Sequence, residues 1–108
     1  MDNINISLDD VSLIIATYNE EESLPFVLDE IKDYNFGEII IVDGDSTDNT
    51  EIIAREYGAI FIKQNKKGWG NAVLEGFSKS NFKFITYMDG DGSYNPVAIQ
   101  EMKSMIDS

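Results

Sequence analysis

Four short and almost continuous apolar runs recur along the chain, and segments with helical spacing separate them. The runs are residues 11–16, 38–42, 59–62 and 82–88. An unbroken apolar run of this length is typical of a strand that is covered on both faces, as in parallel sheets. Strands that alternate with helices predict an α/β fold with right-handed crossovers. We therefore expect one domain over residues 1–108, in which helices cover both faces of a parallel sheet of about four strands.

The segments between the runs predict the helices. Residues 20–34 space their apolar side chains three and four apart, and Pro25 is acceptable in a first helical turn. A second helix should end at Gly58, because glycine commonly follows the last helical residue. A third helix contains Ala72, and Asn95-Pro96 should open a last one.

Polar clusters follow three of the predicted strands: Thr17-Tyr18, Asp43-Gly44-Asp45 and Asp89-Gly90-Asp91. The carboxyl ends of parallel strands share one edge of a sheet, where open α/β proteins bind ligands. Carboxylates such as Asp89 and Asp91 hold Mg²⁺ or Mn²⁺ together with substrate phosphates. Taken alone, the third cluster is equally consistent with a turn, because Asp and Gly favour turns. Three clusters at one edge favour a binding site.

Composition excludes several kinds of chemistry. The chain has no histidine and no cysteine, which removes Ser-His-Asp and Cys-His sites, structural zinc and disulfides. A net charge of −12 argues against nucleic-acid binding, which needs clustered cations. The first residues lack the pattern of a signal peptide, and no apolar stretch approaches the length of a spanning helix. We therefore expect a cytoplasmic protein, associated with the cytoplasmic face of a membrane only through a partner.

Four motifs stand in order along nearly the whole chain. They are residues 14–20 (IIATYNE), 40–50 (IIVDGDSTDNT), 68–72 (GWGNA) and 88–92 (MDGDG). In order and spacing they resemble the nucleotide-sugar half of family 2 inverting glycosyltransferases of the GT-A type, especially dolichyl- or polyprenyl-phosphate sugar synthases. The resemblance implies a UDP- or GDP-sugar donor, a sheet order of 3-2-1-4 and an Asp-x-Asp metal motif.

The same resemblance implies roles for individual residues. The nucleotide would lie near Ala16, Thr17, Tyr18, Glu20 and Asp43, where Ala16 replaces a usual proline. Asp89 would approach the ribose or the metal, and Asp91 would hold Mg²⁺ or Mn²⁺ against the diphosphate.

The resemblance also implies what lies outside this stretch. The family continues with an acceptor half that contains the catalytic base, whereas this chain ends at Ser108. We therefore expect the chain to bind a donor but to transfer no sugar alone. The acceptor would be a polyprenyl phosphate or a glycan. A homodimer or a partner chain should cover the exposed edge of the fourth strand.

Plainer interpretations of the same residues stay open. Tyr18 is also consistent with packing on the first helix, and the charges of 20–22 with a first helical turn. Asp43 is consistent with a capping or Asx-turn role, although the family's usual Asp-Asp-Gly order favours it over Asp45 as the base contact. Lys67, like the lysine before it, fits a solvated loop better than a phosphate contact.

Three other functions fit the pattern less well. A non-catalytic nucleotide-sugar sensor or a partner-completed subunit would keep the donor motifs. A phosphoacceptor signalling domain would need a lysine after a later strand, and none follows Met88 closely. A nucleotidyltransferase would carry a basic, glycine-rich loop after its first strand, where this chain is acidic from Glu20 to Glu21.

Overall fold

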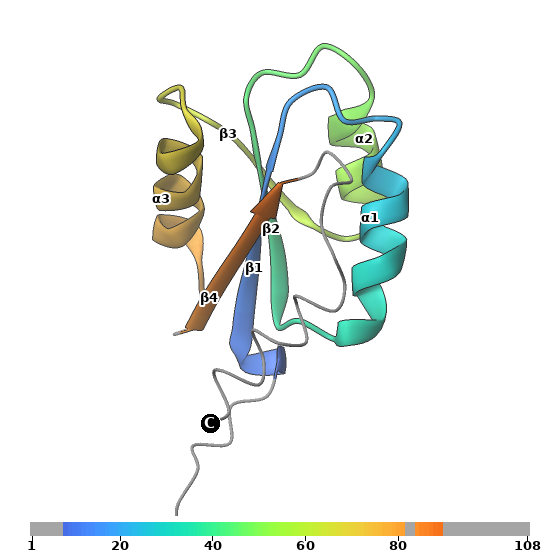
Figure 1. The fold of residues 1–108 in the computed structure, drawn as a ribbon, viewed down its shortest axis with the longest axis vertical. Coiled ribbons are helices and arrows are strands. Elements are labelled where there is room, and N and C mark those ends of the chain that lie inside the picture. The colour runs from blue at the N-terminus through green and yellow to red at the C-terminus, as the bar shows by residue number, and fades with distance from the viewer. Residues whose placement is uncertain (1–7, 82–83, 90–108) are drawn as a thin grey trace, which may run out of the picture.

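The computed structural model of the chain describes residues 8–81 and 84–89, which form a parallel sheet between two layers of helices (Figure 1). The strands are β1 (Val11–Thr17), β2 (Glu38–Asp43), β3 (Ile60–Lys63) and β4 (Phe84–Asp89). The helices are α1 (Leu24–Ile31), α2 (Thr50–Glu56) and α3 (Trp69–Lys79), with short 3-10 helices η1 (Leu8–Asp10) and η2 (Lys32–Tyr34). The strand order is β3-β2-β1-β4 and every pairing is parallel, which confirms the predicted fold and the implied order.

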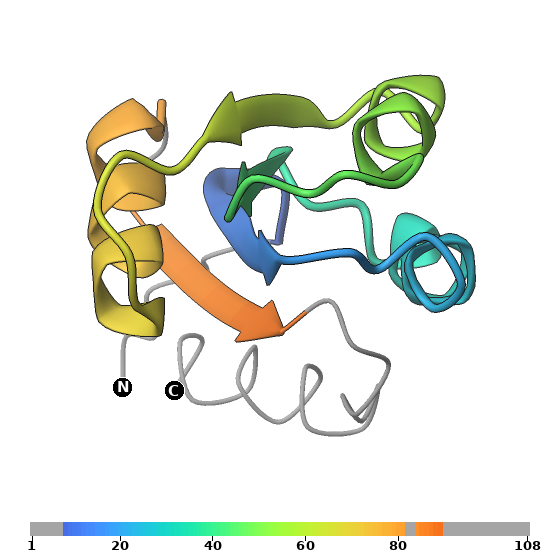
Figure 2. The same cartoon turned by 90° about the horizontal axis from the view of Figure 1, so that it is seen from above.

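The two faces of the sheet are covered by different helices, as Figures 1 and 2 show: α1 and α2 lie on one face and α3 on the other. Successive strand residues point to opposite faces, so Leu13 and Ile15 belong to the core under α1 and α2. Ile14, with Ile40 and Val42, belongs to a second core beside α3. This double coverage is the physical reason that the strands read as unbroken apolar runs.

The first helix begins later than its apolar spacing predicts. Residues 21–23 form turns, and α1 starts at Leu24 with a proline in its first turn. The backbone amide of Glu20 donates to the hydroxyl of Thr50 at the start of α2, and that of Glu21 donates to the Asp48 carboxylate. Asn35, in the left-handed region at φ 58°, ends η2 and turns the chain toward β2. Loop contacts therefore override helical spacing at this end.

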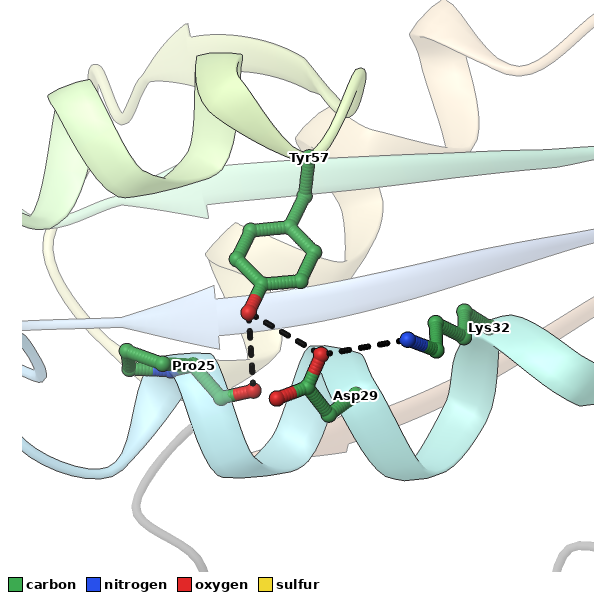
Figure 3. A network of polar contacts seen from close by, with 4 residues as sticks. All are labelled: Pro25, Asp29, Lys32 and Tyr57. Carbon is green, nitrogen blue, oxygen red and sulfur yellow. Dashed lines mark hydrogen bonds and ion pairs between the residues drawn. The ribbon is translucent and has the colours of Figure 1, made fainter.

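Helices α1 and α2 are joined by a polar contact on the face that they share (Figure 3). The Tyr57 hydroxyl follows α2 and donates to Asp29 Oδ1 at 3.0 Å and to the Pro25 carbonyl at 3.4 Å. Lys32 forms an ion pair with the same Asp29 oxygen at 3.5 Å. Desolvation and the neighbouring carboxylate raise the pKa of Tyr57. The contact links α1 to the residue that follows α2.

A second polar network lies at the amino end of the strands. The Glu38 carboxylate accepts hydrogen bonds from Ser12 Oγ on β1 at 2.6 Å and from the backbone and side-chain nitrogens of Asn81 at 2.7 and 3.0 Å. Ser80 Oγ in turn donates to Ser12 Oγ at 2.6 Å. Desolvation raises the pKa of Glu38, but these hydrogen bonds outweigh it and leave the pKa below 4.5. The network ties the end of α3 to the sheet, at the edge opposite the polar clusters.

Two expectations lie beyond the described part of the chain. The helix expected to open at Asn95-Pro96 falls outside the described residues, as does the start of the fourth apolar run at 82–83. Among the helices that are described, none has the length and apolar character needed to span a membrane.

Candidate functional site

The carboxyl ends of β1 and β2 meet side by side, which places the first two polar clusters together. Thr17 and Asp43 are register partners, and Thr17 Oγ1 donates to Asp43 Oδ1 at 2.7 Å. Asp43 is only 2% exposed. Its other oxygen accepts the Ser46 amide at 2.7 Å, and the Ser46 hydroxyl donates to Oδ1. Both carboxylate oxygens are thus used within the protein, where they hold the start of the loop after β2.

Reciprocal hydrogen bonds join the loop after β1 (residues 18–23, the first loop) to the loop after β2 (residues 44–49, the second loop). Asn19 donates its amide to Ser46 Oγ at 2.7 Å and accepts the Thr47 amide on Oδ1 at 2.8 Å. Asn19 has φ 51° and Asp45 has φ 74°, which are left-handed conformations that asparagine and aspartate tolerate better than most residues. The two loops therefore hold one another in shape.

The hydrogen bonds between the first and second loops, here called the clasp, continue to the start of α2. Glu21 donates its amide to Asp48 Oδ2 at 3.1 Å, and its carboxylate accepts the Asn49 amide at 2.9 Å. The hydroxyl of Thr50, which is fully buried, accepts the Glu20 amide at 2.9 Å and donates to Asp48. Desolvation raises the pKa of Asp48, but hydrogen bonds from Thr50 and Glu21 lower the pKa by a larger amount. The pKa of Asp48 therefore lies below 3.8. The carboxylate is stabilised in the charged form that the clasp needs.

A third loop, residues 64–68 between β3 and α3, closes the site from the other side. The backbone amide of Gln64 donates to the Asp43 carbonyl at 2.7 Å, which continues the sheet pairing past β3. The Glu75 carboxylate of α3 accepts the amides of Asn65 and Lys66 at 2.7 and 3.0 Å, and these bonds lower its pKa. Asn71 Nδ2 donates to the Lys67 carbonyl at 2.7 Å. The loop is therefore anchored to the helix that follows it.

The three loops surround an open cavity of about 920 Å³ at the carboxyl edge of the sheet. Its lining comes from the end of β1 and the first loop (Ala16, Thr17, Tyr18, Glu20), the second loop (Gly44, Asp45, Thr47), the end of β3 and the third loop (Lys63, Gln64, Asn65, Lys67, Gly68), and Ala72 of α3. The ring of Tyr18 is 60% exposed and offers a flat apolar surface. Lys63 and Lys67 bring positive charge to a strongly acidic chain. A planar ring with an attached anion matches such a lining.

The structure brings most of the predicted site residues together. The cavity is lined by Ala16, Thr17, Tyr18 and Glu20. Asp43 is not part of the lining but holds Thr17 and the second loop in place through its hydrogen bonds. Their contact with a nucleotide stays a prediction. For Asp43, the hydrogen bonds show the turn-stabilising role that the sequence left open.

The predicted metal ligands are placed only in part. Strand β4 ends at Asp89, whose register partner on β1 is Ala16, a residue of the cavity lining. Asp91 lies outside the described residues, and within them no group of three or more acidic side chains could hold a metal. Aspartate is a residue type that binds Mg²⁺ or Mn²⁺ through oxygen, and the roles of Asp89 and Asp91 as metal ligands stay a prediction.

Sequence reasoning missed part of the lining. The lining includes Asp45, which the sequence ranks below Asp43, and Lys67, which the sequence places in solvent. It also includes Lys63 and Gln64, which the sequence pattern does not single out. Yet β3 ends at Lys63, and Gln64 follows it directly. The rule that placed the other clusters at the carboxyl edge also applies to this strand. The position of Lys63 and Gln64 at the end of a strand is therefore the sequence signal that indicates them.

Fold and cavity together define a protein with an open parallel sheet and a cavity at its carboxyl edge, which is where proteins of this class bind ligands. More particularly, the chain belongs to glycosyl transferase family 2, which matches residues 12–108. It is 33% identical over 95 residues to glycosyltransferase AglJ of Haloferax volcanii, covering 87% of this chain and 31% of that protein. It is 36% identical over 90 residues to the dolichyl-phosphate hexose transferase of the same organism, covering 82% of this chain and 39% of the relative. The chain thus spans well under half the length of these relatives.

Solved structures show the same fold. Glucosyl-3-phosphoglycerate synthase from Mycobacterium tuberculosis, in complex with Mg²⁺ and UDP, superposes with a TM-score of 0.80 at 23% identity, over 91% of this chain and 39% of that one. Its complex with Mn²⁺, UDP-glucose and phosphoglyceric acid gives a TM-score of 0.79 at 21% identity, with the same coverage. The sheet and helices described here therefore correspond to part of a GT-A glycosyltransferase fold.

Proposed function

We propose that this chain binds the nucleoside diphosphate sugar donor of an inverting glycosyltransferase, with UDP- or GDP-sugar as the donor. The observation that carries the proposal is the cavity at the carboxyl edge, because it combines the exposed Tyr18 ring with Lys63 and Lys67. An aromatic face suits a nucleobase, and lysine suits phosphate. Family membership and the UDP bound by the mycobacterial synthase support the same reading.

Different residues of the cavity would contact different parts of the donor. Tyr18 would stack on the base, with the backbone of Ala16 and Thr17 beside it at the end of β1. The two lysines would face the diphosphate. Thr17 and Asp43 act below the ligand, because their hydrogen bond fixes the strand ends on which the loops stand.

A divalent cation would complete the donor site, with Asp89 and Asp91 as the residues that hold it. Mg²⁺ or Mn²⁺ would neutralise the charge that develops on the departing nucleoside diphosphate. The mycobacterial synthase has been solved with each of these ions in the presence of UDP or UDP-glucose, which supports the choice. The cation also gives an anionic donor a favourable partner on a chain of net charge −12.

The transfer step would draw on residues that this stretch does not supply. A relative named for dolichyl phosphate supports a polyprenyl phosphate acceptor, with a glycan as the other class. We propose that a longer chain, a partner or a second copy provides the region that binds the acceptor, together with the catalytic base. Such a partner would also cover β4, which is an edge strand among the residues that the structure describes. The expected place of action is the cytoplasmic face of a membrane.

Calorimetric titration of UDP and of GDP into the chain tests donor binding. We expect one of the two to bind with Mg²⁺ or Mn²⁺ and to bind about tenfold or more weakly in chelator, because the diphosphate then loses its cation. Asp91→Ala should remove most of this metal dependence. Asp33→Ala is the matched control, because Asp33 is exposed in η2, next to the amino end of β2. Equal affinity with cation and with chelator would contradict the metal role, and absence of any nucleotide binding would contradict the function.

A further inference from the structure

The orientation of the Gln64 side chain is determined by its neighbours. Its Nε2 donates to the carbonyl oxygens of both Lys66 and Gly68, the latter at 2.7 Å. A carbonyl can only accept, so the nitrogen and not the oxygen must face the third loop. The amide therefore cannot rotate by half a turn without losing both bonds.

The fixed nitrogen leaves the oxygen directed at the cavity. A Cβ built on Gly44 would lie 3.6 Å from Gln64 Oε1, 3.5 Å from the Thr17 carbonyl and 3.8 Å from Tyr18 Cδ1. Gln64, Gly44 and Tyr18 all line the same cavity. Within the described part of the chain, no hydrogen bond is directed to Oε1, so an immobilised acceptor faces the ligand space.

Gly44 has no side chain to fill the space between Gln64 Oε1 and the Tyr18 ring. Its amide donates to the Thr17 carbonyl at 2.9 Å, which fixes the backbone, and the missing side chain leaves space bounded by the Tyr18 ring and Gln64 Oε1. A flat ring that stacks on Tyr18 would present its edge to the oxygen. Uracil and guanine carry a ring N–H at that edge, whereas cytosine and adenine have a bare ring nitrogen at the corresponding position.

We infer that Gln64 is the residue that selects the base of the donor, with Oε1 accepting the ring N–H of uracil or guanine. The inference rests on the proposed function and extends it to a residue with no assigned role. A preorganised acceptor discriminates strongly, because a bound base that lacks the donor would shield the oxygen from water and leave it unpaired. Gln64 is a specificity residue and takes no part in bond making.

The test compares a nucleotide with its methylated form, using N3-methyl-UDP beside UDP and N1-methyl-GDP beside GDP. For whichever parent binds, we expect the chain to prefer it over the methylated form by about tenfold or more in calorimetric titration with Mg²⁺. Gln64→Ala removes the acceptor and makes room for the methyl group. The preference should then fall to about twofold or less, a residual that the remaining contacts explain.

Asn71→Ala is the matched control for damage to the loop. Asn71 Nδ2 anchors the third loop through the Lys67 carbonyl at 2.7 Å, yet Asn71 does not line the cavity. This variant should keep the full preference for the parent nucleotide, even if its affinity falls. A preference that collapses in Asn71→Ala as in Gln64→Ala would overturn the inference, because loop shape would then set it. A preference that survives in Gln64→Ala would also overturn it.

Gly44→Ala gives a second and independent measurement. The new methyl group would stand at ordinary contact distances from its neighbours, and Gly44 lacks a left-handed φ, so the fold should tolerate it. It would nevertheless occupy the space in front of Gln64 Oε1, and we expect the affinity for the parent nucleotide to fall about tenfold. Unchanged affinity would show that the base lies elsewhere. If the unaltered chain binds no nucleotide, the proposed function fails first, which separates that outcome from a failure of the role of Gln64.

Discussion

At the scale of single residues, the site depends on hydroxyl and carboxylate groups that are buried beneath the cavity. Asp43 accepts three hydrogen bonds from two residues and is almost fully enclosed. Thr50 is fully enclosed and serves both the first and the second loop. A buried polar group is costly when it loses its partner, so these residues should matter to stability as much as to binding.

Thr50→Val tests the clasp between the first and second loops. Valine keeps the shape of threonine but leaves the Glu20 amide and the Asp48 carboxylate without their bond to the hydroxyl. We expect the free energy of unfolding in urea to fall by about 1–3 kcal/mol. Thr50→Ser keeps the hydroxyl and should lose less. Thr47→Val is the control, because Thr47 is exposed and its hydroxyl reaches Asn19 only at 3.5 Å. Equal losses at positions 47 and 50 would contradict the role of the clasp.

At the scale of elements, the approach of α3 to β1 depends on a glycine. A Cβ built on Gly76 would lie 2.6 Å from Ile14 Cγ2 and 3.0 Å from Ile14 Cδ1. Ile14 is fully buried, and its γ-methyl cannot move away without a change of rotamer. The helix can lie this close to the sheet only because residue 76 has no side chain.

Gly76→Ala and Gly70→Ala therefore form an informative pair on one helix. We expect Gly76→Ala to lower the free energy of unfolding by about 1–3 kcal/mol, because the methyl group overpacks the interface. At Gly70 a Cβ would meet nothing within 4 Å. Gly70→Ala should be neutral or stabilising by up to about 1 kcal/mol, because alanine favours helix. Chemical denaturation of both variants decides the matter, and a Gly76→Ala chain as stable as the parent would rule out the close approach.

At the scale of the whole molecule, the chain is strongly acidic, so the contribution of one carboxylate to stability is hard to separate from the general repulsion between negative charges. Glu38 is an exception, because it joins β1, β2 and the segment after α3 through its hydrogen bonds. Its pKa is lower in the folded chain than the ordinary 4.5. A lowered folded pKa means that the contribution to stability is present above 4.5 and is lost as the pH falls through the folded value.

Glu38→Gln should therefore cost the most stability at neutral pH and progressively less in acid. We expect the difference in unfolding free energy between the parent and this variant to shrink from about pH 6 to about pH 3, as the parent carboxylate becomes protonated. Denaturation in urea at several pH values measures this difference. Glu30→Gln removes the same charge from an exposed position on α1 and controls for the change in net charge. A difference at Glu38 that grows in acid would have the wrong sign for a lowered pKa.

Local sequence was sufficient for the layers of the fold. The apolar runs marked the four strands to within a few residues, because a strand between two helical layers has no face for polar side chains. Gly58, at φ 79°, ends the second helix as predicted, because glycine adopts this conformation without strain. The cluster Thr17-Tyr18 reached the cavity because it directly follows a strand.

Other features were decided only by tertiary contacts. Helix α1 begins only at Leu24, and the amides of Glu20 and Glu21 bond to Thr50 and Asp48, partners some 30 residues away that no local pattern contains. The sequence favours Asp43 over Asp45 as a base contact, but only the fold shows that the Asp43 carboxylate is buried in the protein while Asp45 lines the cavity. Gln64 became a site residue because backbone carbonyls of its own loop fix its amide. Periodicity reports which residues are covered, whereas the direction of a hydrogen bond depends on groups that only folding brings together.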